Sequence, residues 1–323
     1  MDSTNNITFI NQNLHISSED KSPNHFQVGI ICCVISFFNL IIETLACYSF
    51  YKIKHFTKTM SFEIMRHQSH LVIILQLCHF ATSFITMFDL EEIFLFNLLV
   101  GSLMEFSYVG YVSFILLLSI NRFDAMYNNF FFPNISRKKI FSIGIIICYL
   151  FGFPIFVFFV IPNNRLVYNG QAYGWTFRQS IRVVLIVARI KGNTILAFLV
   201  ICFILYILII LKIIQMRCRS KKIRKKSLSL EDFKLLIHTQ LCFATIAFVE
   251  LCWIGIFPFF ISTITGTMCV QILFNSITGV NTLFTLIFVK DVFKVLSMCF
   301  FKSKTNKNNV PKANKVKPHI SVQ

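Results

Sequence analysis

The chain has 323 residues, of which 55% are hydrophobic and 14% are charged, and its mean hydropathy is +0.68. Soluble domains average about 25% charged residues, so this composition excludes a soluble globular protein and indicates one that lies largely in lipid. The formal net charge of +17 does not indicate binding to nucleic acid. The basic residues lie beside apolar segments, and the sequence has no basic stretch with interleaved aromatic residues.

Seven apolar segments are each long enough for a helix to cross the hydrocarbon core, which takes about 20 residues. They predict an all-α membrane protein whose single domain, residues 28–301, is a bundle of seven transmembrane helices. An N-terminal segment, 1–27, precedes the bundle, and a disordered basic tail, 302–323, follows it. The predicted spans are Val28–Phe50, Leu71–Phe88, Phe94–Ile120, Ile140–Ile161, Gly192–Leu211, Leu235–Ile261 and Met268–Val289.

Basic residues are distributed unevenly between the gaps. Twenty-five of the 31 Lys and Arg residues lie on one side of the predicted membrane, in 51–70, 121–139, 212–234 and 290–323. The positive-inside rule therefore predicts an extracellular N-terminus and a cytoplasmic C-terminus. We expect a multi-pass protein of the plasma membrane. The glycosylation acceptor Asn6, in Asn6-Ile7-Thr8, lies in the segment predicted to be extracellular.

The fifth span is predicted to begin at Gly192, directly after Lys191. A charge at the centre of a span costs about 2.5–3.5 kcal/mol, and this start avoids that cost. Residues 162–191 then form a long outer loop. Within it, Asn169-Gly170 is a type I′ hairpin signal. Such a hairpin either lids a pocket between the helices or forms a surface loop, since Asn-Gly also marks turns in general.

The third predicted span ends in Asn121-Arg122-Phe123. By itself Arg122 could be an anchor that reaches the lipid headgroups. In a seven-span chain, however, the arrangement resembles the rhodopsin-like G-protein-coupled receptor superfamily, whose third helix ends in Asp/Glu-Arg-Tyr. Asn121 replaces the acid, so the carboxylate that holds the Arg in the resting state of many such receptors is missing.

Further elements are similar to nematode serpentine chemoreceptors, and nearest to the Srx type. Ala125, Phe132-Pro133 and the basic segment Arg137–Phe141 follow the Asn-Arg-Phe motif in the expected order. The proline lies further from Arg122 than in that pattern, as if a few residues near Asn128–Phe131 were inserted. The resemblance covers the whole bundle, but only the third-helix motif is specific.

The resemblance implies a chemosensory receptor, concerned with olfaction, that binds a small extracellular ligand and activates a heterotrimeric G protein. It implies coupling to that protein through Asn121, Arg122 and Phe123. It also implies that Trp253, in Cys252-Trp253 before Pro258, lies beneath the ligand. The alternative is that Trp253 is an apolar residue that fills the bundle.

Four ionisable residues lie deep in the predicted spans, namely Glu43, His79, Glu105 and Glu250. Such residues usually face the bundle interior or a water-filled cavity. We predict that Glu105, Tyr108, Glu250 and Trp253 bind the ligand, which would be cationic if the acids are ionised. The alternative is that the acids are neutral structural links. For His79 we favour a structural bond to Glu43.

The remaining features concern the cytoplasmic side. The basic run Lys221–Lys226 either attracts anionic membrane lipid or contacts the G protein. Residues Lys290–Phe301 predict a short amphipathic helix at the interface, with palmitoylation at Cys299.

Other functions find little support in the sequence. It has no metal-ligand pair at helical spacing, no phosphate loop and no nucleophile elbow, so we expect no metal, no cofactor and no enzymatic activity. A transporter or a ligand-gated channel remains the alternative to a receptor, although no internal repeat and no charged pore-lining face are visible.

Overall fold

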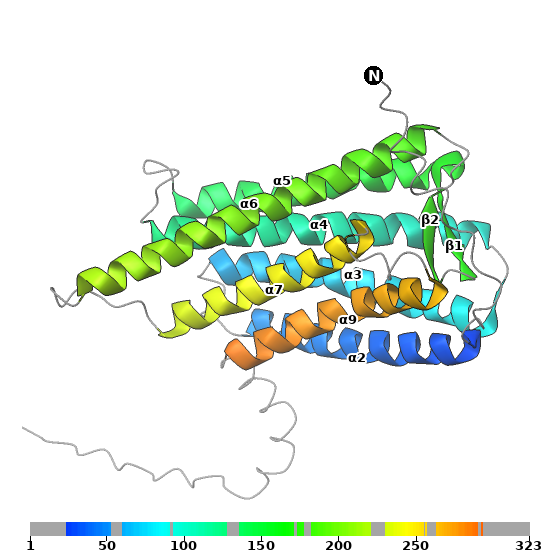
Figure 1. Cartoon of the computed structure of the whole chain (residues 1–323), viewed down its shortest axis with the longest axis horizontal. Coiled ribbons are helices and arrows are strands. Elements are labelled where there is room, and N and C mark those ends of the chain that lie inside the picture. The colour runs from blue at the N-terminus through cyan, green and yellow to red at the C-terminus, as the bar shows by residue number, and fades with distance from the viewer. Residues whose placement is uncertain are drawn as a thin grey trace, which may run out of the picture.

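The computed structural model describes residues 24–52, 60–90, 93–127, 136–170, 173–177, 182–220, 230–254, 256, 263–289 and 292. Within these ranges, seven helices are long and apolar enough to cross a membrane, which confirms the predicted bundle. They are α2 (His25–Lys52), α3 (Met60–Phe88), α4 (Phe94–Met126), α5 (Arg137–Val160), α6 (Arg182–Ser220), α7 (Leu230–Ile254) and α9 (Ile264–Phe288). Figure 1 shows these helices packed along one another in a single bundle.

Helix α4 lies at the centre of the bundle. In its most apolar stretch 67% of the residues are buried, against 22% for α2 and for α5. It contacts α3, α5, α6 and α7. Small residues at a helix interface let the backbones of membrane helices approach closely. The buried small residues of α4 include Gly101, Ser102, Ser107, Gly110, Ser113 and Ser119.

Glycines bring two neighbouring helices close to α4. A Cβ atom added at Gly110 would lie 2.6 Å from Cδ1 of Leu71 on α3. One added at Gly152 of α5 would lie 2.9 Å from the backbone oxygen of Phe106. The backbone oxygen cannot move aside as a side chain can, so Gly152 is required for the close approach of α4 and α5.

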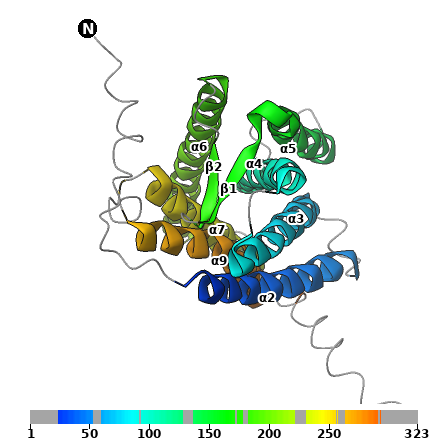
Figure 2. The same cartoon turned by 90° about the vertical axis from the view of Figure 1, so that its right-hand side faces the viewer.

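A short hairpin crosses one end of the bundle, as Figure 2 shows. A 3-10 turn, η3 (Pro162–Asn164), precedes strand β1 (Leu166–Asn169), which pairs antiparallel with β2 (Gly174–Phe177). Strand β1 contacts the first turns of α4. We call this end of the bundle the hairpin end. Arg122 lies near the last turn of α4, so we call the opposite end the Arg122 end.

The hairpin is confirmed, but its turn is not the predicted type I′ turn. Asn169 pairs with Gly174, so four residues connect the strands instead of two. Among the described non-glycine residues only Asp89 and Tyr173 have a positive φ, and Asn169 does not. The buried side chains of Leu166 and Tyr173 hold the strands against the helices. This packing, not the local Asn-Gly preference, therefore sets the register.

The predicted start of the fifth span was wrong. Helix α6 begins at Arg182, not at Gly192, and so includes Lys191. The charge of Lys191 is tolerated because its ammonium group is paired with Glu105, 2.7 Å from Oε2. A continuous helix also satisfies its own backbone hydrogen bonds, which a loop at this depth would leave open.

Other helices also begin earlier than predicted. Helix α3 begins at Met60 and not at Leu71, and α7 begins at Leu230 and not at Leu235, because each helix continues beyond its apolar stretch. The end of the sixth predicted span, including Pro258, lies outside the described residues. So do the tail 302–323 and the predicted amphipathic helix 290–301, apart from Val292.

The close approach at Gly152 can be tested by substitution. Gly152→Ala is expected to lower the melting temperature of the detergent-purified protein, because overpacking costs about 1–3 kcal/mol. Gly192→Ala is the matched control, since an added Cβ there meets nothing within 4 Å. That control should leave the melting temperature unchanged or slightly raised, because alanine favours helix more than glycine does. Equal melting temperatures for the two variants would contradict this account.

Candidate functional site

A network of polar side chains joins three helices near the hairpin end. Glu105 on α4 accepts hydrogen bonds from Nζ of Lys191 on α6, at 2.9 Å to Oε1 and 2.7 Å to Oε2. Tyr108, one turn further along α4, donates its hydroxyl to the carboxylate of Glu250 on α7. Lys191 also lies within electrostatic range of Glu250. We call Glu105, Tyr108, Lys191 and Glu250 the acidic network.

The acidic network supplies its own cation. In the low dielectric of a bundle interior, a buried acid needs a paired charge or a proton. Lys191 meets this need for Glu105, and the Tyr108 hydroxyl satisfies an oxygen of Glu250. An amine ligand would therefore have to displace Lys191 before it could pair with Glu105.

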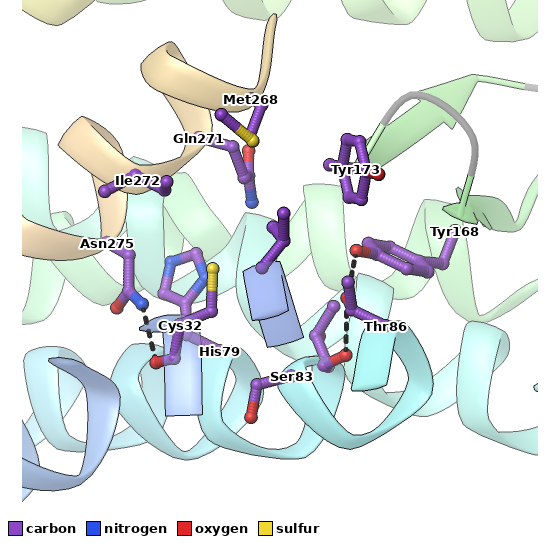
Figure 3. A pocket seen from close by; sticks show the side chains of 12 residues that line it. Cys32, His79, Ser83, Thr86, Tyr168, Tyr173, Met268, Gln271, Ile272 and Asn275 are labelled. Atoms are coloured by element: carbon purple, nitrogen blue, oxygen red, sulfur yellow. Dashed lines mark hydrogen bonds between the residues drawn. The ribbon is translucent and has the colours of Figure 1, made fainter. Parts of the chain in front are cut away.

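A cavity lies beneath the hairpin. Its walls come from α2, α3 and α9, and its roof comes from Tyr168 and Tyr173 of the hairpin (Figure 3). We call this cavity the hairpin pocket. Its polar lining includes His79 and Gln271, and its apolar lining includes Val28.

The roof of the hairpin pocket is tied to α3. The hydroxyl groups of Tyr168 and Thr86 lie 2.5 Å apart, in a hydrogen bond that Figure 3 marks. Burial raises the pKa of Tyr168 well above its ordinary value, so the phenol keeps its proton. The ring of Tyr173 packs against that of His25 on α2, with 5.1 Å between the centroids. These contacts make the hairpin a lid over the cavity, which is the first of the two alternatives for this segment.

His79 lies in the hairpin pocket and not against Glu43. Its side chain is 4% exposed, and Nε2 has no hydrogen-bond partner within the described part of the chain. Glu43 instead accepts a hydrogen bond from Thr282 on α9 and lines a separate cavity with Ser69. Ser69 precedes His79 by ten residues, about 15 Å along a helix at 1.5 Å per residue. The expected His79–Glu43 bond is therefore wrong, because the two side chains lie at different depths.

At the Arg122 end, polar contacts tie the third-helix motif to its neighbours. Asn121 is fully buried and donates Nδ2 to Ser61 Oγ on α3, at 2.7 Å. Its Oδ1 and its backbone oxygen accept from the guanidinium of Arg137 on α5, at 2.6 Å and 2.7 Å. Nε of Arg137 lies 3.5 Å from Asp124 Oδ2 in an ion pair. Asn121 is thus a link between three helices.

The residues beside Asn121 complete the motif. Arg122 is 8% exposed and lies within electrostatic range of His238 on α7. Phe123 is buried and stacks on Tyr127, with 4.3 Å between the ring centroids. The nearby acid, Asp124, pairs with Arg137 of α5. An acid is therefore present at this end of α4, although it lies two residues after Arg122 and not directly before it.

Comparison with known families decides the identity of this arrangement. Residues 34–289 match the family described as serpentine type 7TM GPCR chemoreceptor Srx. The chain belongs to the Srx family of chemoreceptors. It is thus a multi-pass membrane protein of the plasma membrane, as the distribution of apolar segments predicted.

A solved structure agrees with this fold. The crystal structure of squid rhodopsin superimposes on the Srx chain with a TM-score of 0.64 and 10% sequence identity, and the match covers 91% of this chain and 94% of that one. At such low identity the similarity concerns the fold alone. No curated protein matches the sequence.

The four predicted ligand residues of this Srx receptor are only partly brought together. Glu105, Tyr108 and Glu250 meet in the acidic network. Trp253 is 41% exposed and does not join them. Its predicted role beneath the ligand stays a prediction, and its position on α7 does not support it. Asn6, Cys299 and the run Lys221–Lys226 lie outside the described residues, so their predicted roles also stay predictions.

The positions of two site residues were not predicted from the sequence. Lys191 was assigned to a loop, although a lysine in an apolar segment of a chain with buried acids is a candidate partner for one of them. His79 was expected to bond to Glu43. The expectation failed because periodicity within one helix does not show how deep a residue on a neighbouring helix lies. The sequence cannot identify the residues that Lys191 and His79 contact, because the packing of α4 against α6 and of α3 against α9 decides which side chains meet.

The ion pair of the acidic network can be tested by a double-mutant cycle. Lys191→Gln should destabilise the purified receptor, because removing one partner of a buried pair costs about 3–5 kcal/mol. Glu105→Gln added to Lys191→Gln should restore much of the lost melting temperature, since no unpaired charge then remains. Arg189→Gln, an exposed site on the same helix, is the control and should have little effect. Additive losses in the double variant would exclude the pair.

Proposed function

We propose that this Srx receptor binds a small extracellular ligand within its helix bundle and activates a heterotrimeric G protein in the cytoplasm. The observation that carries the proposal is the position of Asn121-Arg122-Phe123. The motif lies near the last turn of α4, the most buried helix of the bundle, at the end opposite the hairpin pocket and the acidic network. Helix α4 therefore joins the acidic network, through Glu105 and Tyr108, to the candidate coupling residues.

The proposal includes an orientation. The hairpin end faces the outside, and the Arg122 end faces the cytoplasm, as the excess of Lys and Arg in the gaps of that side supports. Residues 1–27, with Asn6, are then extracellular. Residues 302–323 and the palmitoylation site Cys299 are cytoplasmic, with Lys221–Lys226 available to anionic lipid or to the G protein.

A ligand shifts the receptor toward an active state only if it binds that state better than the resting one. Polar contacts between helices that change partners are suitable elements for such a shift. Helices α4, α7 and α9 share several: Asn281 of α9 donates Nδ2 to the hydroxyl of Tyr111 at 2.6 Å and accepts from Thr245 at 2.9 Å. His238 of α7 lies 2.8 Å from Thr285 Oγ1 of α9. Movement of α7 would rearrange these contacts and change the surroundings of Arg122.

Substitution of Arg122 tests the coupling role. Arg122→Ala should abolish the calcium response of cells that express a promiscuous G protein, while the receptor still reaches the cell surface. Lys138→Ala is the matched control, because it removes an exposed positive charge at the same end of the bundle. That variant should respond like the unaltered receptor. Unchanged signalling by Arg122→Ala would remove Arg122 from its proposed role.

Access from outside the cell tests the orientation. An antibody against an epitope appended to residue 323 should label permeabilised cells only, whereas one against an epitope before residue 1 should label intact cells. The positive-inside rule requires this result for a chain with most of its basic residues on one side. Labelling of the C-terminal epitope on intact cells would overturn the receptor proposal.

A further inference from the structure

The lining of the hairpin pocket includes a polar atom that has no hydrogen-bond partner among the described residues. Nε2 of His79 is buried and has no hydrogen-bond partner within the described residues. Buried polar atoms are nearly always hydrogen-bonded in proteins, so an exception of this kind indicates a partner beyond the described residues, such as a ligand. A ligand that bonds to Nε2 gains a contact without breaking one inside the bundle.

Other polar groups of the pocket are already engaged. Thr82 donates its hydroxyl to the backbone oxygen of Cys78 at 2.7 Å. Asn275 donates to the backbone oxygen of Cys32 at 3.2 Å and to Ser36 Oγ at 2.8 Å. The amide of Gln271 points into the cavity (Figure 3) and is not hydrogen-bonded to any described residue. The side chains of His79 and Gln271 are therefore available to hydrogen-bond the polar group of a ligand.

The pocket does not suit an ion. Among the described residues that line it there is no Asp, Glu, Lys or Arg, and none of them gives His79 an acidic partner. An ion placed in this cavity would lose its hydration without gaining an opposite charge, which is strongly unfavourable. The acidic network does not change this, because Lys191 already neutralises Glu105. The charge pattern thus selects an uncharged ligand.

The apolar walls restrict the ligand further. Val28, Met268 and Ile272 supply an apolar surface beside the polar head position. The complement of this lining is a small molecule with a short apolar body and one hydrogen-bonding group.

The pocket is also in contact with the acidic network. The ring of His79 meets that of Phe274 edge to face, with 5.2 Å between the centroids. Phe274 in turn meets Tyr108 edge to face at 5.0 Å, and Tyr108 donates to Glu250 on α7. A ligand that reorients His79 therefore acts, through two ring contacts, on the hydrogen bond that joins α4 to α7.

We propose that the hairpin pocket is the ligand site of this receptor and takes a small uncharged molecule with one hydrogen-bonding group, such as an alcohol or a ketone, held by His79. The proposal deepens the proposed function and rests on it for the consequence of binding. Binding itself is independent of any G protein and can be measured on the purified chain.

The test uses four probes with six carbon atoms each, namely hexanol, hexanone, hexylamine and hexanoate, and the full-length receptor purified in detergent. Hexanol or hexanone should raise the melting temperature in a saturable way, whereas the amine and the carboxylate should not. His79→Leu should weaken this binding on the order of tenfold or more, the factor expected for one lost hydrogen bond of about 1.4 kcal/mol. His70→Leu, on the same helix but remote from the pocket, is the control and should bind as the unaltered receptor does.

Several results would overturn the proposal. These are a larger shift with hexylamine or hexanoate, no shift with either neutral probe, or an unchanged shift in His79→Leu. Gln271→Leu provides a second variant should His79→Leu fail to fold, and it should weaken binding in the same direction. The same probes applied to cells separate the two proposals. Binding that depends on His79 without any calcium response would contradict the proposed function alone, and a calcium response that survives His79→Leu would contradict the pocket alone.

Discussion

The structure depends on the requirement that a charged group inside the lipid-embedded bundle finds a partner within it. The pair between Glu105 and Lys191 is the clearest instance, because each residue alone would be an unpaired charge among apolar helices. Their contact joins α4 to α6, and the bond from Tyr108 to Glu250 joins α4 to α7. Helix α4 is therefore positioned by electrostatic and hydrogen-bonding contacts as much as by the close packing of its small residues.

The same requirement distinguishes the two candidate ligand regions. In the acidic network the charges satisfy one another, so a ligand must compete with Lys191 for its place. In the hairpin pocket Nε2 of His79 has no partner among the described residues, so a ligand completes the site instead of displacing a side chain. Intramembrane acids can thus be parts of the scaffold, whereas a buried histidine beneath a lid, without a partner among the described residues, is the better candidate for recognition.

The motif at the Arg122 end shows how a departure from a family pattern is accommodated. Asn121 stands where the superfamily has an acid, and its amide bonds to Ser61 and accepts from Arg137. Asp124 then pairs with Arg137. These contacts tie α3, α4 and α5 together without a carboxylate directly before Arg122. Arg122 itself is buried at this end of α4 and lies within electrostatic range of His238.

The sequence by itself determined the number of helices, their order and the membrane class, because apolar length and the placement of basic residues are local properties that lipid selects directly. It also located the hairpin, the motif ending α4 and the buried acids. Only the tertiary structure decided which groups are partners: that Lys191 lies in a helix beside Glu105, that the hairpin turn has four residues, and that His79 faces a pocket instead of Glu43. Partnership depends on the relative depth and rotation of helices distant in sequence, and no pattern within a single segment encodes these.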